Sequence, residues 1–177
     1  MLSIEKIREF QKNQEELDKL IQEKVIERKK ITSYNYEESF PSVKLALFVE
    51  IGELANEIKS FKYWKNDPLV DWTKVKEELI DCFHFFLSLS NFFKINFSRY
   101  RLINELGKEK PINDLLLELF SRTELIAVNG LKKEENFYSW LNSFEGICEK
   151  FEIGEKELIF IYEKKNKINK DRQKNNY

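Results

Sequence analysis

The stretch "EELIDCFHFFLSLSNFF", residues 77–93, is apolar on nearly every side when it is projected as a helix. A helix of this kind lies in the centre of a protein, with other helices packed around it. Glu78 and Asp81 nevertheless share one face of it, and no Lys or Arg occurs between Glu77 and Asn91. Because a buried carboxylate is costly without a nearby cation, the stretch predicts a central helix whose acids are neutralised from outside.

A second set of acids precedes it in "KLALFVEIGELANEIKSFKYWK", residues 44–65. Glu50, Glu53 and Glu57 fall within about 60° of one another on a helix, beside an apolar stripe. An isolated E-x-x-E is usually a pair on a solvated face, and acids near a helix start, such as Glu78, favour the helix dipole. Those two interpretations stay open for each set alone. Together, the two sets predict four carboxylates between two core helices.

Facing carboxylates repel one another by about 4 kcal/mol per pair at 4 Å when the effective dielectric constant is near 20. A divalent metal ion removes that repulsion. Zinc and di-iron sites usually include histidine, and a di-iron bundle takes a Glu-x-x-His motif from each of two helices. The chain has one histidine, His84. An oxygen-only ligand set therefore predicts Mg²⁺ or Mn²⁺, and Mg²⁺ normally binds together with phosphates.

The rest of the chain has the pattern of an all-α protein. Glycine and proline are scarce, with 5 and 3 copies, and apolar residues recur every three or four positions. We expect a loop at 31–42 in which Pro41 and the cap Ser42 open the second helix, and helices at residues 4–28, 43–61, 73–93, 112–128, 133–150 and 155–172. Because no internal repeat or long linker divides the chain, residues 1–177 are predicted to form a single-domain helical bundle. It would have about six or more helices around a four-helix core that carries the carboxylate metal site.

Composition excludes several classes of partner. Lys and Arg number 30 against 31 Asp and Glu, and the net charge of −1 provides no broad field for a nucleic acid or an anionic membrane. The two cysteines, Cys82 and Cys148, make neither a disulfide framework nor a zinc spacing. The N-terminus is too charged for a signal peptide, and the longest uncharged run is far short of the roughly 20 residues of a membrane span. We therefore expect a soluble, cytoplasmic protein that binds neither nucleic acid nor membrane.

The C-terminal stretch "IYEKKNKINKDRQKNNY", residues 161–177, looks at first like a solvated, lysine-rich end. Helical projection, however, places two cations and three amides on the same face as Tyr162. These residues are Lys165, Asn166, Asn169, Arg172 and Gln173. Lysine and arginine can bind neighbouring phosphates, and amides can bond a sugar hydroxyl or a phosphate oxygen. The tail is thus a second candidate for contacts with a phosphorylated ligand.

Taken together, these motifs resemble the dimeric, all-α dUTPase family, a branch of the all-α nucleoside triphosphate pyrophosphohydrolases related to MazG-like proteins. The resemblance runs nearly end to end. It includes "QEELDKLI" from Gln14, the paired "EIGE" and "ELID", "FKYWK", "DCFHFFLSL" and "YEKKNKINKDRQKNNY". The E-x-x-E and E-x-x-D pair is typical of the superfamily, and the tail pattern Y-x-x-K-N-x-x-N-x-x-R-Q is similar to the dUTPase branch.

The resemblance implies a dUTP nucleotidohydrolase that produces dUMP and pyrophosphate, acts also on dUDP, limits uracil in DNA, and forms a homodimer. It implies that Mg²⁺ is held by Glu50, Glu53, Glu78 and Asp81. One of these acids, Glu53, is our choice of general base. By the same resemblance, Gln14 and Trp64 would contact the base and Phe85 the deoxyribose. The tail would bind phosphates and sugar through Lys165, Asn169, Arg172, Asn166 and Gln173. We expect His84 to have a structural role. Glu57 either supports the four metal-binding acids without contacting the metal ion or has no role in the site.

Two alternatives stay open from the sequence. A related pyrophosphohydrolase for another nucleotide, such as dCTP or a damaged nucleotide, would share the acids, because base choice depends on a few residues. A non-catalytic helical interaction module would explain the apolar periodicity but would leave the four acids unexplained. A panel of nucleotide substrates distinguishes the first alternative from a dUTPase, and a metal titration distinguishes the second from an enzyme of either kind.

Overall fold

The computed structural model describes residues 2–66, 68–100, 109–127 and 132–175. Within these ranges the chain forms α-helices and one short 3-10 helix, η1, and no strand. The helices are α1 (Ile4–Lys29), α2 (Tyr36–Ile58), α3 (Trp72–Phe92), η1 (Phe97–Arg99), α4 (Ile112–Leu125), α5 (Lys133–Lys150) and α6 (Glu155–Lys174). The prediction of an all-α bundle is confirmed.

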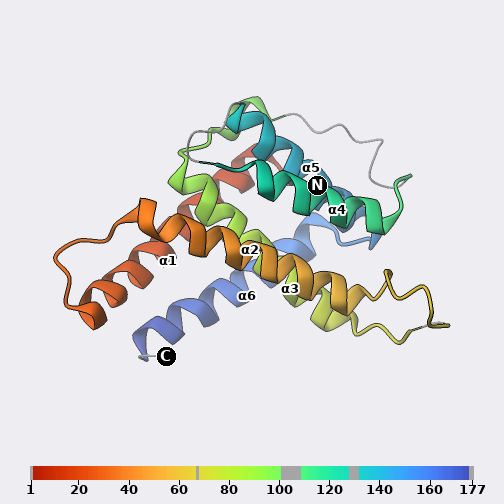
Figure 1. Cartoon of the computed structure of the whole chain (residues 1–177), viewed down its shortest axis with the longest axis horizontal. Helices are drawn as coiled ribbons and strands as arrows, with labels where there is room; N and C mark the ends of the chain where they lie inside the picture. The colour runs from red at the N-terminus through yellow and green to blue at the C-terminus, as the bar shows by residue number, and fades with distance from the viewer. Residues whose placement is uncertain (1, 67, 101–108, 128–131, 176–177) are drawn as a thin grey trace.

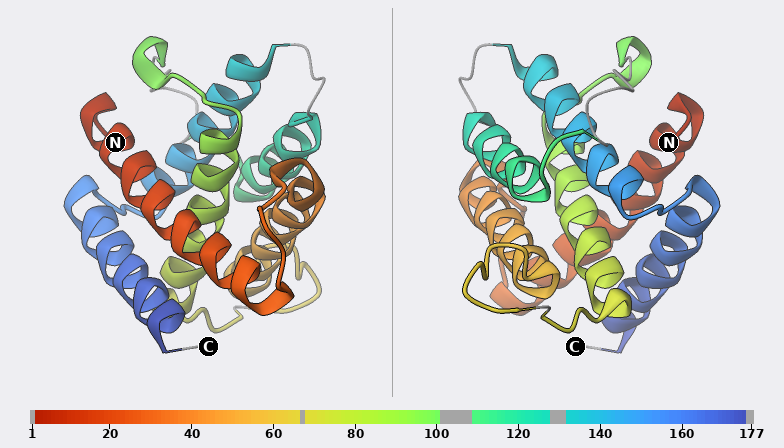
Figure 2. Two further views of the ribbon diagram at one scale, coloured as in Figure 1. Left: turned by 90° about the vertical axis from the view of Figure 1, so that its left-hand side faces the viewer. Right: turned by 90° about the vertical axis from the view of Figure 1, so that its right-hand side faces the viewer.

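Helix α3 lies in the centre of the bundle, as its apolar sequence predicts. It packs most extensively against α2 and also contacts α1 and α6, while α1 and α6 lie side by side (Figures 1 and 2). Helices α4 and α5 form a second pair that contacts the core through α2 and through aromatic side chains. The four helices α1, α2, α3 and α6 therefore form the four-helix core that carries the acids.

The expected start of the second helix is wrong, whereas the first and third helices begin within one residue of the expected positions. Ser3 caps α1 by accepting the backbone N–H of Lys6, and Asp71 caps α3 in the same manner. Helix α2, by contrast, begins at Tyr36, because Asn35 accepts two backbone N–H groups. Ser42 is therefore not a cap, and Pro41 lies inside the helix.

Tertiary packing supports the early start of α2 that the Asn35 cap provides. The ring of Tyr36 lies 6.1 Å from that of Phe92 at the end of α3, and the ring of Phe40 stacks on Phe92 at 5.7 Å. This aromatic packing stabilises the first turns of the helix although Pro41 lacks an N–H donor. At the other end, α2 stops at Ile58, and Lys59 takes a left-handed conformation with φ 62°.

The remaining helix ends lie close to the predicted positions. Helices α5 and α6 begin as expected, and α6 extends to Lys174. Helix α4 ends at Leu125, and residue 128, where it was expected to end, lies outside the described residues. Helix ends commonly vary by one or two residues, so these differences do not move the site.

A stack of aromatic rings holds the core together and fixes the rotation of α3. Phe83 stacks on Phe144 at 4.8 Å, and Phe86 stacks on Trp140 at 4.1 Å. Both α3 residues are fully buried. Because these rings occupy the α5 side of α3, the side of α3 that carries the acids turns toward α2 and α6.

Two further expectations concern the chain as a whole. Cys82 and Cys148 are both free and buried, in agreement with the expected absence of a disulfide. Within the described ranges, none of the helices has both the length and the apolar character needed to cross a membrane.

Candidate active site

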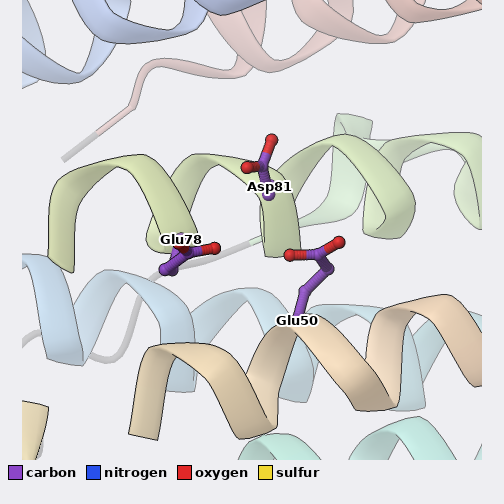
Figure 3. Close-up of side chains that lie close together, drawn as sticks. All are labelled: Glu50, Glu78 and Asp81. Carbon is purple, nitrogen blue, oxygen red and sulfur yellow. The ribbon is translucent and has the colours of Figure 1, made fainter. Parts of the chain in front are cut away.

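Three of the predicted acids meet between α2 and α3. Glu50 reaches from α2 toward α3, from which Glu78 and Asp81 project (Figure 3). One carboxylate oxygen of each lies within 4.8 Å of the others, and all three side chains are half-buried. Three oxygens gathered in this way are suited to hold one hard divalent cation.

The pKa values of the cluster reflect burial and the repulsion between neighbouring acids. Burial, followed by the negative charges of Asp81, Glu53 and Glu78, raises the pKa of Glu50 to about 7. Burial and neighbouring acids also raise the pKa of Glu78. The pKa of Asp81 is raised as well, chiefly by burial. Each acid is therefore harder to ionise than a free carboxyl group, and additional positive charge would favour its ionised form.

Glu53 and Glu57 lie beside the cluster rather than in it. Glu53 is exposed and is not one of the three acids whose oxygens converge. Its charge still acts on Glu50 and on Glu78. A carboxylate so placed can take a proton from a water molecule next to the cluster without being a ligand itself. Glu57 acts electrostatically on Glu78 from one turn further along α2.

Lys165 supplies a cation to the part of α3 between Glu77 and Asn91, which has no Lys or Arg of its own. Its Nζ lies 2.6 Å from Asp81 Oδ2, and the two side chains are 21% and 18% exposed. The positive charge of Lys165 lowers the pKa of Asp81, although burial outweighs it. The charge of Arg172, two turns further along α6, acts on Asp81 in the same direction. The tail is therefore docked against the acids and is not merely a solvated end.

The amides of the tail do not all face the acids. Asn166 is only 7% exposed, and its Nδ2 donates to the Tyr162 hydroxyl at 3.5 Å. Both residues line a hollow of about 330 Å³ together with residues of α1 and α6. Asn169 and Gln173 are half-buried. Residues predicted to share one face of α6 therefore contact two different helices: Lys165 contacts α3, whereas Asn166 packs toward α1.

Gln14 belongs to a polar cluster between α1 and α3. Its amide nitrogen donates to Asp18 Oδ1 at 2.8 Å and to Ser88 Oγ at 3.0 Å, and its oxygen lies 2.6 Å from His84 Nδ1. Ser88 also donates to Asp18 Oδ1, at 2.8 Å. Burial raises the pKa of Asp18 to about 6. Gln14 itself is 3% exposed, so Asp18 and Ser88 form the more accessible side of this cluster.

His84 is held in one state by its surroundings. Burial lowers its pKa to about 3, so the imidazole is neutral at physiological pH. The Gln14 oxygen accepts from Nδ1, which places the ring proton there. The ring stacks on Tyr162 at 4.6 Å, and Nε2 is buried without a hydrogen-bond partner among the described residues. These contacts join α1, α3 and α6 behind the acids.

The two aromatic residues expected at the nucleotide lie in different settings. Phe85 is half-buried and packs against the core from α3. Trp64 is 60% exposed in the loop between α2 and α3, where its ring makes edge contacts with Phe61 and Tyr63. Phe85 lies between the acids and Ser88 along α3, whereas Trp64 lies on a loop outside the core.

Asp81, Phe85 and Ser88 occupy successive turns of one face of α3. Seven residues separate Asp81 from Ser88, which corresponds to about 10 Å along the helix axis. The face thus carries acids at one end, a ring in the middle, and the polar cluster at the other end. This order suits a ligand with phosphates, a sugar and a base.

Asp18 also belongs to this site, although the sequence did not single it out. It lies four residues after Gln14 and so on the same side of α1. In the sequence, Asp18 is recognisable only as an acid at the edge of the apolar stripe that contains Leu17. Because α1 has many acids, it is the contact with Ser88 in the structure that distinguishes Asp18 from the others.

Comparison with known proteins gives one result. Residues 6–177 match the sequence profile of a family described as dUTPase. The match extends over all six helices described above. No curated protein sequence matches the chain.

Proposed function

The chain belongs to the all-α dUTPase family and is a dUTP diphosphatase, and we propose that the reaction takes place at Glu50, Glu78 and Asp81 with a divalent metal ion. The observation that carries this proposal is the convergence of three half-buried carboxylates on two core helices. Burial and mutual repulsion raise the pKa values of these acids, so a divalent cation would favour their ionised forms. No other group of three or more such ligands occurs among the described residues.

The donor set fits Mg²⁺ or Mn²⁺, because all three groups offer oxygen and their oxygens lie within 4.8 Å of one another. When bound there, such an ion would supply positive charge for the phosphates and a lowered pKa for a water molecule. Glu53, predicted as a fourth ligand, is in our proposal the general base. Its carboxylate is exposed next to the cluster and can receive the proton of the attacking water.

The chemical step that we propose is attack of water on the β phosphorus of dUTP. The bond between that phosphorus and the oxygen bridging to the α phosphate breaks. Pyrophosphate then carries the water oxygen, and dUMP leaves with the bridging oxygen. The same attack on dUDP yields dUMP and phosphate. Lys165 and Arg172 hold phosphate oxygens, Lys165 as a point charge and Arg172 through its fork.

The opposite end of the face reads the base. Uracil carries an N3–H donor, which cytosine lacks, and the Gln14 cluster is rich in acceptor oxygens, including the Asp18 carboxylate. Phe85 lies between this cluster and the acids, beside the expected position of the deoxyribose. In this proposal Asn169 and Gln173, which are half-buried on α6, contact the sugar or the phosphates, and Trp64 contacts the base from its exposed loop. We assign Asn166 a lesser role because its amide is packed toward α1.

We also propose that the protein is a homodimer, as the family resemblance implies. Large apolar side chains remain exposed on the outer faces of α2 and α4, namely those of Leu45, Val49, Leu117 and Leu125. Burial of such side chains in a subunit interface would be favourable. Light scattering coupled to size-exclusion chromatography measures the oligomeric state, and a monomer at micromolar concentration would contradict the proposal.

A product assay over dUTP, dUDP, dTTP, dCTP and UTP tests the proposed function. We expect dUMP from dUTP and dUDP, and loss of turnover in excess EDTA. Asp81→Asn should remove most activity, while circular dichroism shows the helices intact. Undiminished turnover in EDTA would overturn the metal-assisted mechanism. A preference for dCTP would instead favour the related-pyrophosphohydrolase alternative for this site.

A further inference from the structure

The ion pair between Lys165 and Asp81 places a cation where the proposed metal ion would bind. Lys165 Nζ lies 2.6 Å from Asp81 Oδ2, and Asp81 is one of the three converging acids. An ammonium group and a divalent ion beside one carboxylate repel each other strongly in a half-buried site. Lys165 and the metal ion therefore compete for the charge of Asp81.

We propose that Lys165 is an exchangeable counter-ion, which neutralises Asp81 in the nucleotide-free enzyme and moves to the nucleotide phosphates when metal and nucleotide bind together. This inference rests on the proposed function, since it needs a metal ion at the cluster. The phosphates supply the negative charge that Lys165 loses when it leaves Asp81. Free metal ion alone supplies none, so it must displace Lys165 without compensation.

The surroundings of Lys165 allow the side chain to move while α6 stays in place. Three residues earlier, Tyr162 is fully buried, and its hydroxyl donates to the Phe10 carbonyl oxygen at 3.1 Å. This anchor holds the helix against α1. The lysine side chain is a flexible four-carbon stem with a compact charge, so it can turn between two acceptors that a planar guanidinium would bind with fixed geometry.

Neighbouring lysines of α6 do not share this position. Lys164 is exposed, and Lys167 lines the hollow on the α1 side. Arg172 adds to the positive potential at Asp81 from further along the helix. Lys165 is thus the α6 lysine whose removal should change metal binding directly, and Lys164 provides a matched control on the same helix.

Competition of this kind couples the two ligands. Nucleotide draws Lys165 away and so strengthens metal binding, and by linkage the metal strengthens nucleotide binding by the same factor. Removing the ammonium should therefore have opposite effects on the two ligands. Free metal ion should bind more tightly, on the order of tenfold, whereas KM for dUTP should rise because a phosphate contact is lost.

Mn²⁺ binding to the full chain at pH 8, followed by electron paramagnetic resonance of the free ion, tests this proposal. The proteins are the parent, Lys165→Met, Lys165→Gln and the control Lys164→Met, each with and without a non-hydrolysable dUTP analogue. We expect both Lys165 variants to bind Mn²⁺ about tenfold more tightly than the parent without nucleotide. With the analogue present, that advantage should disappear, and the control should match the parent throughout.

Two negative results have different meanings. If the parent binds no Mn²⁺ even with the analogue, the metal-assisted mechanism itself is wrong. If the parent binds Mn²⁺ but both Lys165 variants bind it no more tightly than the parent does, the exchange proposal is overturned and Lys165 is only a fixed contact. Lys165→Gln keeps a hydrogen-bond donor toward Asp81, so the comparison remains decisive if Lys165→Met proves unstable.

Discussion

The acid cluster should destabilise the metal-free protein, and Glu50→Gln should relieve this. Burial and three neighbouring acids raise the pKa of Glu50 from an ordinary value of 4.5 to about 7. Each unit of pKa corresponds to about 1.4 kcal/mol, so the full effect would be about 3 kcal/mol. Because Glu50 is only half-buried, solvent screening reduces this to about 1 to 2 kcal/mol.

The sign follows from the direction of the shift. Since the pKa of Glu50 is higher in the folded state, folding favours the protonated carboxyl. Its contribution to stability is complete below about pH 4.5 and is lost as pH rises through about 7. In EDTA at pH 8, Glu50→Gln should therefore exceed the parent in free energy of unfolding by about 1 to 2 kcal/mol, and the difference should vanish near pH 4.

Urea unfolding in EDTA at several pH values measures this difference, and thermal melts should show it as a rise of about 2 to 8 °C. Glu23→Gln, which changes an exposed glutamate on α1, is the control and should have no such effect. Addition of Mg²⁺ should stabilise the parent more than Glu50→Gln. If Glu50→Gln is less stable than the parent at pH 8 in EDTA, the acids are not a strained cluster and the reasoning fails.

Three further predictions concern the reaction. In water enriched in oxygen-18, the label should enter pyrophosphate and not dUMP, as mass spectrometry of the products would measure; label in dUMP would place the attack at the α phosphorus. Arg172→Lys should lower kcat/KM for dUTP by tenfold or more, because a point charge does not replace a fork, and steady-state kinetics at unchanged helicity would reveal this. Gln14→Leu leaves His84 Nδ1 without a hydrogen-bond partner and removes one of the two donors to Asp18 Oδ1, which should cost about 1 to 3 kcal/mol in unfolding free energy. It should also reduce the preference for dUTP over dCTP, and an unchanged ratio of kcat/KM values would exclude the Gln14 cluster as the reader of the base.

Much of the fold follows from local patterns. The helix at 77–93 is apolar nearly all round, so it could only be central, and the expected acids at Glu50, Glu78 and Asp81 do converge. Residues on one helix lie at known angles from one another, and therefore the sequence alone specified which acids share a face. The expected start of the first helix at residue 4 likewise agrees with the structure, in which Ser3 caps α1.

Tertiary packing decided the rest, because a helical projection gives angles about one axis and not which neighbour each side meets. It separated Asn166 from Lys165, which the projection had placed together, and left Glu53 outside the converging oxygens. It also stabilised the first turns of α2, which the Asn35 cap begins at Tyr36, through packing of Tyr36 on Phe92 of α3. The sequence determined the acids and their helices. The docking of α6 against α3 brought Lys165 into an ion pair with Asp81. That contact depends on the register of two helices that lie far apart in the chain.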